Sequence, residues 1–257
     1  MPGMIEITPE EAATKNARLI EVKVDGTRMT FDGYNIISDR DVERNARFPH
    51  IVQALRKLNW KVRGEIALPH GNVLQINKRE NWANARFYMF DLFELDGKDL
   101  SHLAPDETRD RIAHALKSLN SDVIGMPRSF PDFGDAWNYA KTQNAKGNYV
   151  EGVVVKPYSG SPYKIKLLTE KKCRIVGFES GSVKGAFLID CDGVVGKVSG
   201  TSVGYVQKYQ QMIMGGLEPY AEIEYQFLTD NGIPFQPRLR QLDTLAALRY
   251  ISSQKVA

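Results

Sequence analysis

A lysine lies on an apolar, strand-like segment just ahead of a turn, in Glu21-Val-Lys23-Val-Asp25-Gly26-Thr-Arg28. Burial among apolar neighbours and nearby cations lowers the pKa of an amine, which makes the neutral form available as a nucleophile. The alternative interpretation is a surface lysine at a hairpin, because Asp-Gly is a common two-residue turn. The segment alone leaves both interpretations open.

Four further segments with charged or aromatic side chains follow in order. They are Val62-Arg63-Gly64-Glu65-Ile66, Phe87-Tyr88-Met89-Phe90-Asp91-Leu92-Phe93, Val150-Glu151-Gly152-Val153-Val154-Val155-Lys156 and Tyr163-Lys164-Ile165-Lys166. The last sets two lysines at i and i+2, on one face of a strand. Taken singly, each segment has an ordinary explanation, such as a solvated carboxylate, a core strand or a wet sheet edge.

The elements that position these residues differ between the two parts of the chain. Up to about Thr169, strand-like runs alternate with segments of helical period, which indicates an α+β domain. The runs are Leu19–Val24, Lys61–Leu68, Ala85–Leu95 and Tyr149–Lys156, and the helical segments are Pro49–Lys57 and Ala104–Leu119.

After Lys171 the chain consists of short β-rich pieces separated by glycine turns. These pieces are Cys173–Phe178, Ala186–Cys191, Val194–Val198 and Ala221–Leu228, with one helix expected over Val203–Met214. Strands at such close intervals are typical of a small barrel of OB type. We therefore predict two domains, 1–169 and 170–257.

The composition is that of a globular protein: 257 residues, 42% hydrophobic and 25% charged. It excludes collagen-like, low-complexity and wholly disordered classes. The net charge of +3 permits a nucleic-acid partner without indicating one. No apolar run approaches the roughly 18 residues that cross a bilayer, and the first fifteen residues carry three glutamates. We expect neither export nor membrane insertion, and a cytoplasmic protein.

The two cysteines, Cys173 and Cys191, are far apart in the sequence and have no CxxC spacing or histidine cluster near them. This pattern favours neither a zinc site nor a disulfide. We predict two reduced thiols.

Taken together, the segments resemble the covalent nucleotidyltransferase superfamily and, within it, the ATP-dependent DNA ligases of the minimal two-domain type found in phages and viruses. The segment KVDGTR at Lys23 matches the KxDGxR nucleophile motif of that family. ISDR at Ile37 to Arg40, followed by RFPHI, resembles the second motif, and RGEI, FYMFDL, EGVVVK and YKIK match the next four in order and spacing. The resemblance implies a nucleotidyltransferase (adenylation) domain of antiparallel sheets with helices, followed by an OB-fold β-barrel.

By this resemblance Lys23 attacks the α-phosphorus of ATP and forms a lysine-AMP intermediate with release of pyrophosphate. Lys164 and Lys166 contact the α-phosphate and neutralise the charge that builds on it. The AMP then passes to the 5′-phosphate at a nick in duplex DNA, and the 3′-hydroxyl seals the nick.

The resemblance also assigns the residues that hold the nucleotide. Glu21 accepts a hydrogen bond from the adenine amino group, Phe90 stacks on the ring, and Glu65 binds the ribose hydroxyls. Glu151, with Glu65, helps hold a divalent ion, Mg²⁺ with Mn²⁺ as an alternative.

Arginines are expected to hold phosphates. Arg28 and Arg40 recognise the 5′-phosphate at the nick, with Arg28 also at the nucleotide. The chain departs from the family here, because Asp39 stands where serine usually runs directly into arginine. In the expected OB domain, Arg238 and Arg240 are the only candidates for orienting pyrophosphate, and the alternative is that they face the DNA backbone.

We expect a monomer that binds nicked double-stranded DNA through both domains. Only 22 residues precede Lys23, which leaves no room for a separate DNA-binding domain or for a nicotinamide-binding module, so ATP is the expected cofactor. Sequence-independent phosphate contacts are expected from basic residues of the OB domain. These are Lys171, Lys172, Arg174, Lys184 and Lys197.

Three other interpretations stay open. An mRNA capping guanylyltransferase shares the lysine chemistry but uses GTP, and an RNA ligase belongs to the same superfamily. A non-catalytic nucleic-acid binder would use only the OB module.

Overall fold

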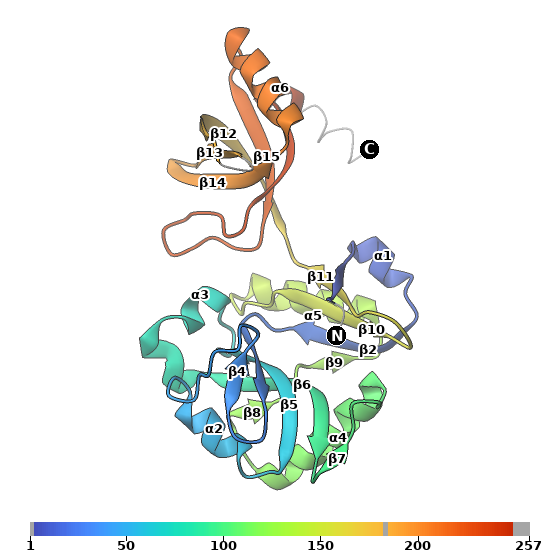
Figure 1. Cartoon of the computed structure of the whole chain (residues 1–257). Coiled ribbons are helices and arrows are strands. Elements are labelled where there is room, and N and C mark those ends of the chain that lie inside the picture. The colour runs from blue at the N-terminus through green and yellow to red at the C-terminus, as the bar shows by residue number, and fades with distance from the viewer. Residues whose placement is uncertain (1–2, 182–184, 249–257) are drawn as a thin grey trace. The chain divides into compact units, whose positions relative to one another are not determined.

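The computed structural model describes residues 3–181 and 185–248, and the chain divides into two compact units, Met1–Leu167 (unit 1) and Leu168–Ala257 (unit 2). Unit 1 contains β1 (Ile5–Glu6), α1 (Pro9–Ala13), β2 (Ala17–Lys23), β3 (Thr27–Phe31), β4 (Ile36–Ser38), α2 (Pro49–Leu55), β5 (Trp60–Ala67), α3 (Val73–Ile76), the 3₁₀ helix η1 (Arg79–Asn84), β6 (Arg86–Leu95), β7 (Lys98–Asp99), α4 (Pro105–Leu119), β8 (Ile124–Gly125), β9 (Ser129–Phe130), α5 (Phe133–Ala145), β10 (Gly152–Pro157) and β11 (Tyr163–Lys166) (Figure 1). Unit 2 contains β12 (Thr169–Glu179), β13 (Gly185–Cys191), β14 (Val194–Thr201), α6 (Val203–Met214), β15 (Pro219–Tyr225) and β16 (Arg238–Thr244).

The first sheet of unit 1 has the strand order β1-β11-β10-β2-β9, antiparallel except for the β1–β11 pair. One face of this sheet is apolar and packs against α5. It contributes Ile20, Val22, Val153, Val155 and Ile165, which meet Ala136 and Ala140 of the helix. Because side chains alternate between faces along a strand, Glu21 and Lys23 lie together on the opposite face.

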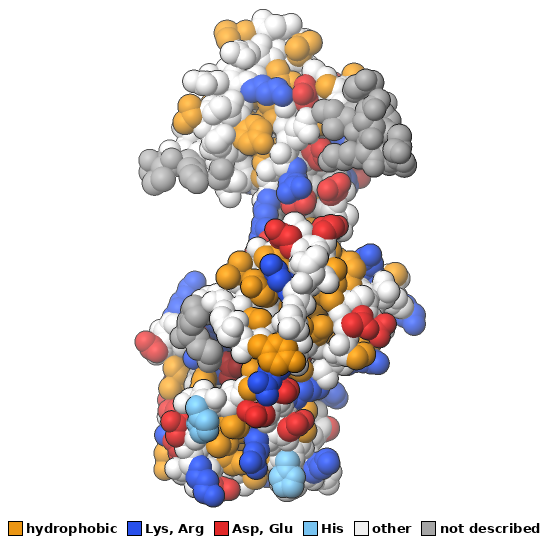
Figure 2. Space-filling view, turned by 90° about the vertical axis from the view of Figure 1, so that its right-hand side faces the viewer, with side chains coloured by type: hydrophobic (Ala, Val, Ile, Leu, Met, Phe, Trp, Pro, Cys, Tyr) orange, Lys and Arg blue, Asp and Glu red, His pale blue; other side chains and the backbone are white. Residues whose placement is uncertain are grey.

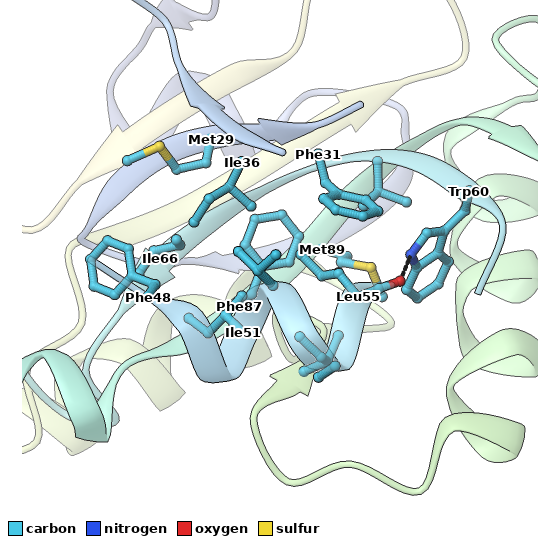
Figure 3. Close-up of a cluster of buried hydrophobic side chains, with 14 of the residues drawn as sticks. Met29, Phe31, Ile36, Phe48, Ile51, Leu55, Trp60, Ile66, Phe87 and Met89 are labelled. Atoms are coloured by element: carbon cyan, nitrogen blue, oxygen red, sulfur yellow. Dashed lines mark hydrogen bonds between the residues drawn. The ribbon is translucent and has the colours of Figure 1, made fainter. Parts of the chain in front are cut away.

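The second sheet of unit 1 has the order β4-β3-β5-β6-β7, and β8 pairs with β6. Its apolar face and α2 form the cluster of buried side chains in Figure 3, which includes Phe31, Phe87 and Met89. Trp60 is buried there and its Nε1 donates a hydrogen bond to the carbonyl oxygen of Leu55, 2.9 Å away. The register sets Arg28, Glu65 and Tyr88 in one row across the sheet, on the face opposite this core.

Helix α4 covers the second sheet and supplies a charged residue to the site described below. Pro105 begins the helix, and the Glu107 carboxylate accepts from the Ala104 N–H, which caps the first turn. Ile112, Ala115 and Leu119 recur at helical spacing and are buried against the sheet core. The predicted helix at Ala104–Leu119 is confirmed to within one residue.

Unit 2 is a five-stranded antiparallel sheet of order β14-β13-β12-β15-β16, with α6 connecting β14 to β15. The two edge strands, β14 and β16, also approach each other. Phe187, Ile189, Ala221, Ile223 and Leu242 fill its core. The predicted helix at Val203–Met214 is confirmed, and α6 begins with Ser202, whose hydroxyl accepts from the Tyr205 N–H.

The prediction of two reduced cysteines is wrong. Cys173 and Cys191 form a disulfide between β12 and β13, with a Cα–Cα distance of 4.9 Å. The register that pairs Arg174 with Asp190 sets the two cysteines opposite each other. They are therefore neighbours across the hairpin although they are 18 residues apart in the sequence. Spacing along the sequence could not reveal this register, because the β12–β13 pairing contains a bulge between Ile175 and Gly177.

The face of unit 1 that is in view in Figure 2 carries charges of both signs, with cations and carboxylates interspersed. Over the ranges that the structure describes, no helix is both long and apolar enough to cross a membrane.

Candidate active site

The register of the first sheet brings three of the predicted residues together. Lys23 on β2 is paired with Gly152 on β10, and Gly152 is paired with Lys166 on β11, so the two lysines lie in one row. Glu151 immediately precedes β10. Its Oε2 accepts a hydrogen bond from Lys23 Nζ, and its Oε1 lies 3.2 Å from Lys166 Nζ. The Glu151 side chain is only 6% exposed. A buried carboxylate therefore lies between two ammonium groups.

Gly152 is required for this arrangement. A Cβ at this position would lie 1.9 Å from the carbonyl oxygen of Ile165, closer than any side chain tolerates. The Glu151 carbonyl accepts from the Leu167 N–H at 2.9 Å, which fixes the backbone next to β11. The close approach of the two strands holds Glu151 beside Lys166.

Two further carboxylates carry raised pKa values near Lys23. Burial raises the pKa of Glu65 to about 8; the charge of Lys23 opposes this shift, while Glu151 and Asp25 add to it. Burial also raises the pKa of Asp25 to about 6, with Glu151 adding to the shift and a hydrogen bond from the Val73 N–H, 2.8 Å away, opposing it. Three carboxylates thus share a poorly solvated region, which favours a bound cation or a retained proton.

Glu21 lies on the Lys23 face of β2 and is held by two cations. Its Oε1 is 2.5 Å from Arg109 Nη1 of α4, and its Oε2 is 2.9 Å from Lys156 Nζ of β10. Lys156 Nζ also donates to the Phe90 carbonyl at 3.1 Å and lies 5.7 Å from the centroid of the Phe90 ring. Glu21, Lys156 and Phe90 are therefore neighbours where the two sheets of unit 1 face each other.

Sequence reasoning missed Arg109 and gave Lys156 no role. Arg109 stands on a helix outside all the matched segments, 88 residues from its partner Glu21, and no spacing along the chain reveals the contact. Lys156 ends the segment EGVVVK, and its alternation with Val154, which pairs with Glu21, places it on the face of Glu21. The alternation was visible in the sequence, but the pairing of the two strands was not.

The predicted phosphate-binding side chains of unit 1 have different surroundings. Arg28 Nη2 is 2.5 Å from Asp39 Oδ2, so the aspartate that departs from the family pattern holds this arginine. Arg40 is exposed and makes no ion pair among the described residues. Lys164 shares the face of Lys166 and pairs with Glu6 at 3.6 Å.

Most of the cations predicted for unit 2 already have partners. Arg240 is 3.3 Å from Glu224, and Arg238 lies on the same strand, β16, among the residues that line an open hollow. Lys172 donates to the Leu248 carbonyl. Lys171 pairs with Asp192, Arg174 with Asp190 and Glu218, and Lys197 with Glu179. Lys184 lies outside the described residues.

Within the part of the chain that the structure describes, no group of three histidine, cysteine or acidic side chains has the arrangement of a metal cage. Mg²⁺ rarely needs one, because it is usually held by one or two carboxylates together with water and substrate phosphates. Glu65 and Glu151 fit that pattern, since Glu65 is partly buried with a raised pKa and a cation would stabilise its ionised form.

Solved structures of DNA ligases share this fold. The chain is similar to a Lig E DNA ligase, from work on DNA binding with a minimal scaffold, with a TM-score of 0.67 and 13% identity over 95% of this chain and 100% of that one. It is also similar to the ligase domain of LigD from M. tuberculosis, with a TM-score of 0.55 and 20% identity over 95% of both chains. A mycobacterial DNA ligase D complexed with ATP and MES gives a TM-score of 0.51 and 18% identity over 94% and 95%.

The fold is therefore that of the DNA ligases, a mixture of sheets with few helices, and the predicted resemblance is confirmed at this level. No protein-family model and no curated protein matches the sequence.

Proposed function

We propose that the protein is an ATP-dependent DNA ligase that seals nicks in duplex DNA through a lysine-AMP intermediate on Lys23. The observation that carries this proposal is that Lys23 and Lys166 both form ion pairs with the buried carboxylate of Glu151, with Glu65 nearby. A structural lysine would gain little from burial next to a second lysine, because like charges repel and both lose hydration.

In the first step the Lys23 nitrogen attacks the α-phosphorus of ATP. The Lys23 ammonium first gives a proton to Glu151, the carboxylate in contact with it, which leaves a neutral amine. The P–N bond then forms as the bond to pyrophosphate breaks, and the nitrogen releases a second proton, which leaves with pyrophosphate. Lys166 and Lys164 neutralise the charge on the α-phosphate during transfer.

The nucleotide is held by residues of both sheets. Glu21 accepts from the adenine amino group, Phe90 stacks on the ring, Glu65 binds the ribose, and Arg28 contacts the phosphates. Glu151 and Glu65 would hold Mg²⁺, which supplies charge neutralisation at the phosphates when bound.

In the second step AMP passes from Lys23 to the 5′-phosphate of the nick, and in the third the 3′-hydroxyl displaces AMP. Arg28 and Arg40 bind the 5′-phosphate. Arg28 must leave Asp39 to bind the phosphate. Because both side chains are exposed, breaking their ion pair costs about 0–1 kcal/mol of free energy.

We assign residues 1–169 to the adenylation domain and 170–257 to an OB domain. The strand order β14-β13-β12-β15-β16 supports an OB barrel. So do the position of α6 after β14, the third strand of the unit along the chain, and the approach of the edge strands β14 and β16 to each other. Arg238 or Arg240 orients pyrophosphate. Lys171, Lys172, Arg174 and Lys197 contact DNA phosphates in place of their present partners, and Lys184, which lies outside the described residues, contacts them as well.

The test uses the full chain with α-labelled ATP or GTP and Mg²⁺, followed by a nicked duplex. We expect a covalent AMP adduct, a DNA-adenylate and a sealed strand. A GMP adduct without an AMP adduct would indicate a capping guanylyltransferase instead. Sealing of an RNA nick without a DNA nick would indicate an RNA ligase, and binding of DNA without any adduct would remove the enzyme assignment.

A further inference from the structure

The ion-pair cluster of Glu21, Arg109 and Lys156 lies in unit 1 beside the nucleophile. Glu21 is two residues from Lys23 on the same face of β2, and its side chain is only 4% exposed. Both of its oxygens face cations, Arg109 at 2.5 Å and Lys156 at 2.9 Å. The plane of this carboxylate is therefore fixed from two sides.

Arg109 is itself anchored. Its Nη1 donates to the Pro127 carbonyl at 2.9 Å as well as to Glu21, so the guanidinium joins α4, the segment before β9 and β2. Because the guanidinium is planar and rigid, two contacts from one nitrogen fix its position more closely than a lysine would.

Helix packing does not account for this pair. Helix α4 already docks on the second sheet through Ile112, Ala115 and Leu119. Replacing a buried ion pair by apolar side chains is often neutral or stabilising, because the desolvation of both charges offsets their attraction. A buried pair two residues from the nucleophile therefore points to recognition rather than to stability.

An ionised carboxylate only accepts hydrogen bonds, and it has about four lone-pair sites. Two are used by Arg109 and Lys156, which leaves sites for a donor on a bound base. An exocyclic amino group supplies such a donor, whereas a carbonyl oxygen at the same position would be repelled. The orientation of Glu21 then decides which base is accepted.

We propose that Arg109 is a positioning residue that fixes the Glu21 carboxylate and so sets the preference of the site for a 6-amino purine over a 6-oxo purine. The proposal rests on the proposed function, in which Glu21 reads the edge of the base. Arg109 acts only through Glu21 and does not touch the nucleotide.

The test measures equilibrium binding of ATP and of GTP by calorimetry for the wild type, Arg109→Ala, Arg109→Lys and Glu21→Gln in the full chain. Arg111→Ala is the matched control, because Arg111 is an exposed arginine on the same helix. We expect Arg109→Ala to lower the ATP-to-GTP affinity ratio by about 10- to 100-fold, the size of a lost charged hydrogen bond. Arg109→Lys should restore part of the ratio, and Arg111→Ala should leave it unchanged.

A double-mutant cycle separates positioning from a structural role. In the Glu21→Gln background, Arg109→Ala should change the ratio no further, because its effect passes through Glu21. An unchanged ratio in a folded Arg109→Ala protein, or equal losses in both backgrounds, would overturn the proposal. Failure of the ligase assignment has a different signature, the absence of an AMP adduct in the wild type.

Discussion

The two units both have exposed ion pairs, as in Arg28–Asp39 of unit 1, but they differ in the charges that they bury. Unit 1 buries three cations, Lys23, Lys166 and Lys156, against the carboxylates of Glu21 and Glu151 between its two sheets. Unit 2 keeps its ion pairs on the surface, as in Lys197–Glu179, where the side chains are 57% and 50% exposed. Its core cluster is formed by hydrophobic side chains and includes the Cys173–Cys191 disulfide.

Under the proposed function, the buried charges of unit 1 are the ones that perform chemistry. Exposed ion pairs lose little hydration when they form, and each contributes about 0–1 kcal/mol to stability. Their presence on a surface therefore does not indicate a function. Buried charges lose several kcal/mol of hydration each and persist only where the arrangement is used or fully compensated. The same residue types therefore indicate a site in unit 1 and a solvated surface in unit 2.

The largest effect is expected at Glu151. Glu151→Gln removes the anion between Lys23 and Lys166, and the two ammonium groups then repel each other. We expect lysine adenylylation to fall by roughly 100- to 1,000-fold, and stability to fall by about 3–5 kcal/mol. Single-turnover adenylylation and urea unfolding measure the two effects. Wild-type adenylylation in a folded variant would separate Glu151 from the chemistry.

The disulfide of unit 2 should matter for stability and not for adenylylation. The bond joins residues 18 apart in the sequence. Closing a loop of this size lowers the conformational entropy of the unfolded chain and so stabilises the folded state by about 3 kcal/mol. We expect Cys173→Ser with Cys191→Ser to lose about this much in denaturant unfolding, and reductant to do the same to the wild type. Two titratable thiols in the unreduced, unfolded protein would contradict the bond.

The sequence predicted the grouping of Lys23, Glu151 and Lys166 in the candidate site of unit 1, by the resemblance of its ordered segments and by strand periodicity. Lys23 and Glu21, and Lys164 and Lys166, share faces because strand side chains alternate, and the ordered segments identified Glu65 and Glu151. Arg109 and the cysteine pairing could not be predicted, because each depends on which helix face or strand register meets a distant element. The ends of the elements were predicted closely for α4 and α6, whose caps and apolar spacing are local.

The carboxylates of unit 1 should make its stability depend on pH. Burial raises the pKa of Glu65 from 4.5 to about 8 and that of Asp25 from 3.8 to about 6, so the folded state retains protons that the unfolded chain releases. Their stabilisation is full below pH 4 and is lost as the pH rises to about 8, with a slope of up to about 1.4 kcal/mol per pH unit for one proton.

Glu65→Gln should flatten this decline between pH 5 and 8. Unfolding free energies of the two proteins at several pH values test this, and parallel curves would show that Glu65 does not hold a proton in the folded state. No comparable decline is expected from the exposed pairs of unit 2.

The smallest effect is expected for those surface pairs. Lys197→Ala should change the unfolding free energy by less than about 1 kcal/mol, because both partners are exposed and water replaces the lost contact. Thermal unfolding at low and high salt measures this change. A loss comparable to that of Glu151→Gln would erase the distinction between the two units.

The most direct measurement is mass spectrometry after incubation with ATP and Mg²⁺, for the wild type and Lys23→Ala. The mass of the intact protein counts the adducts, and the masses of its proteolytic peptides locate them. Catalysis by the buried lysine predicts one AMP on the peptide that contains Lys23, and neither adduct nor nick sealing in the variant. AMP on a different residue, or nick sealing that survives Lys23→Ala, would contradict it.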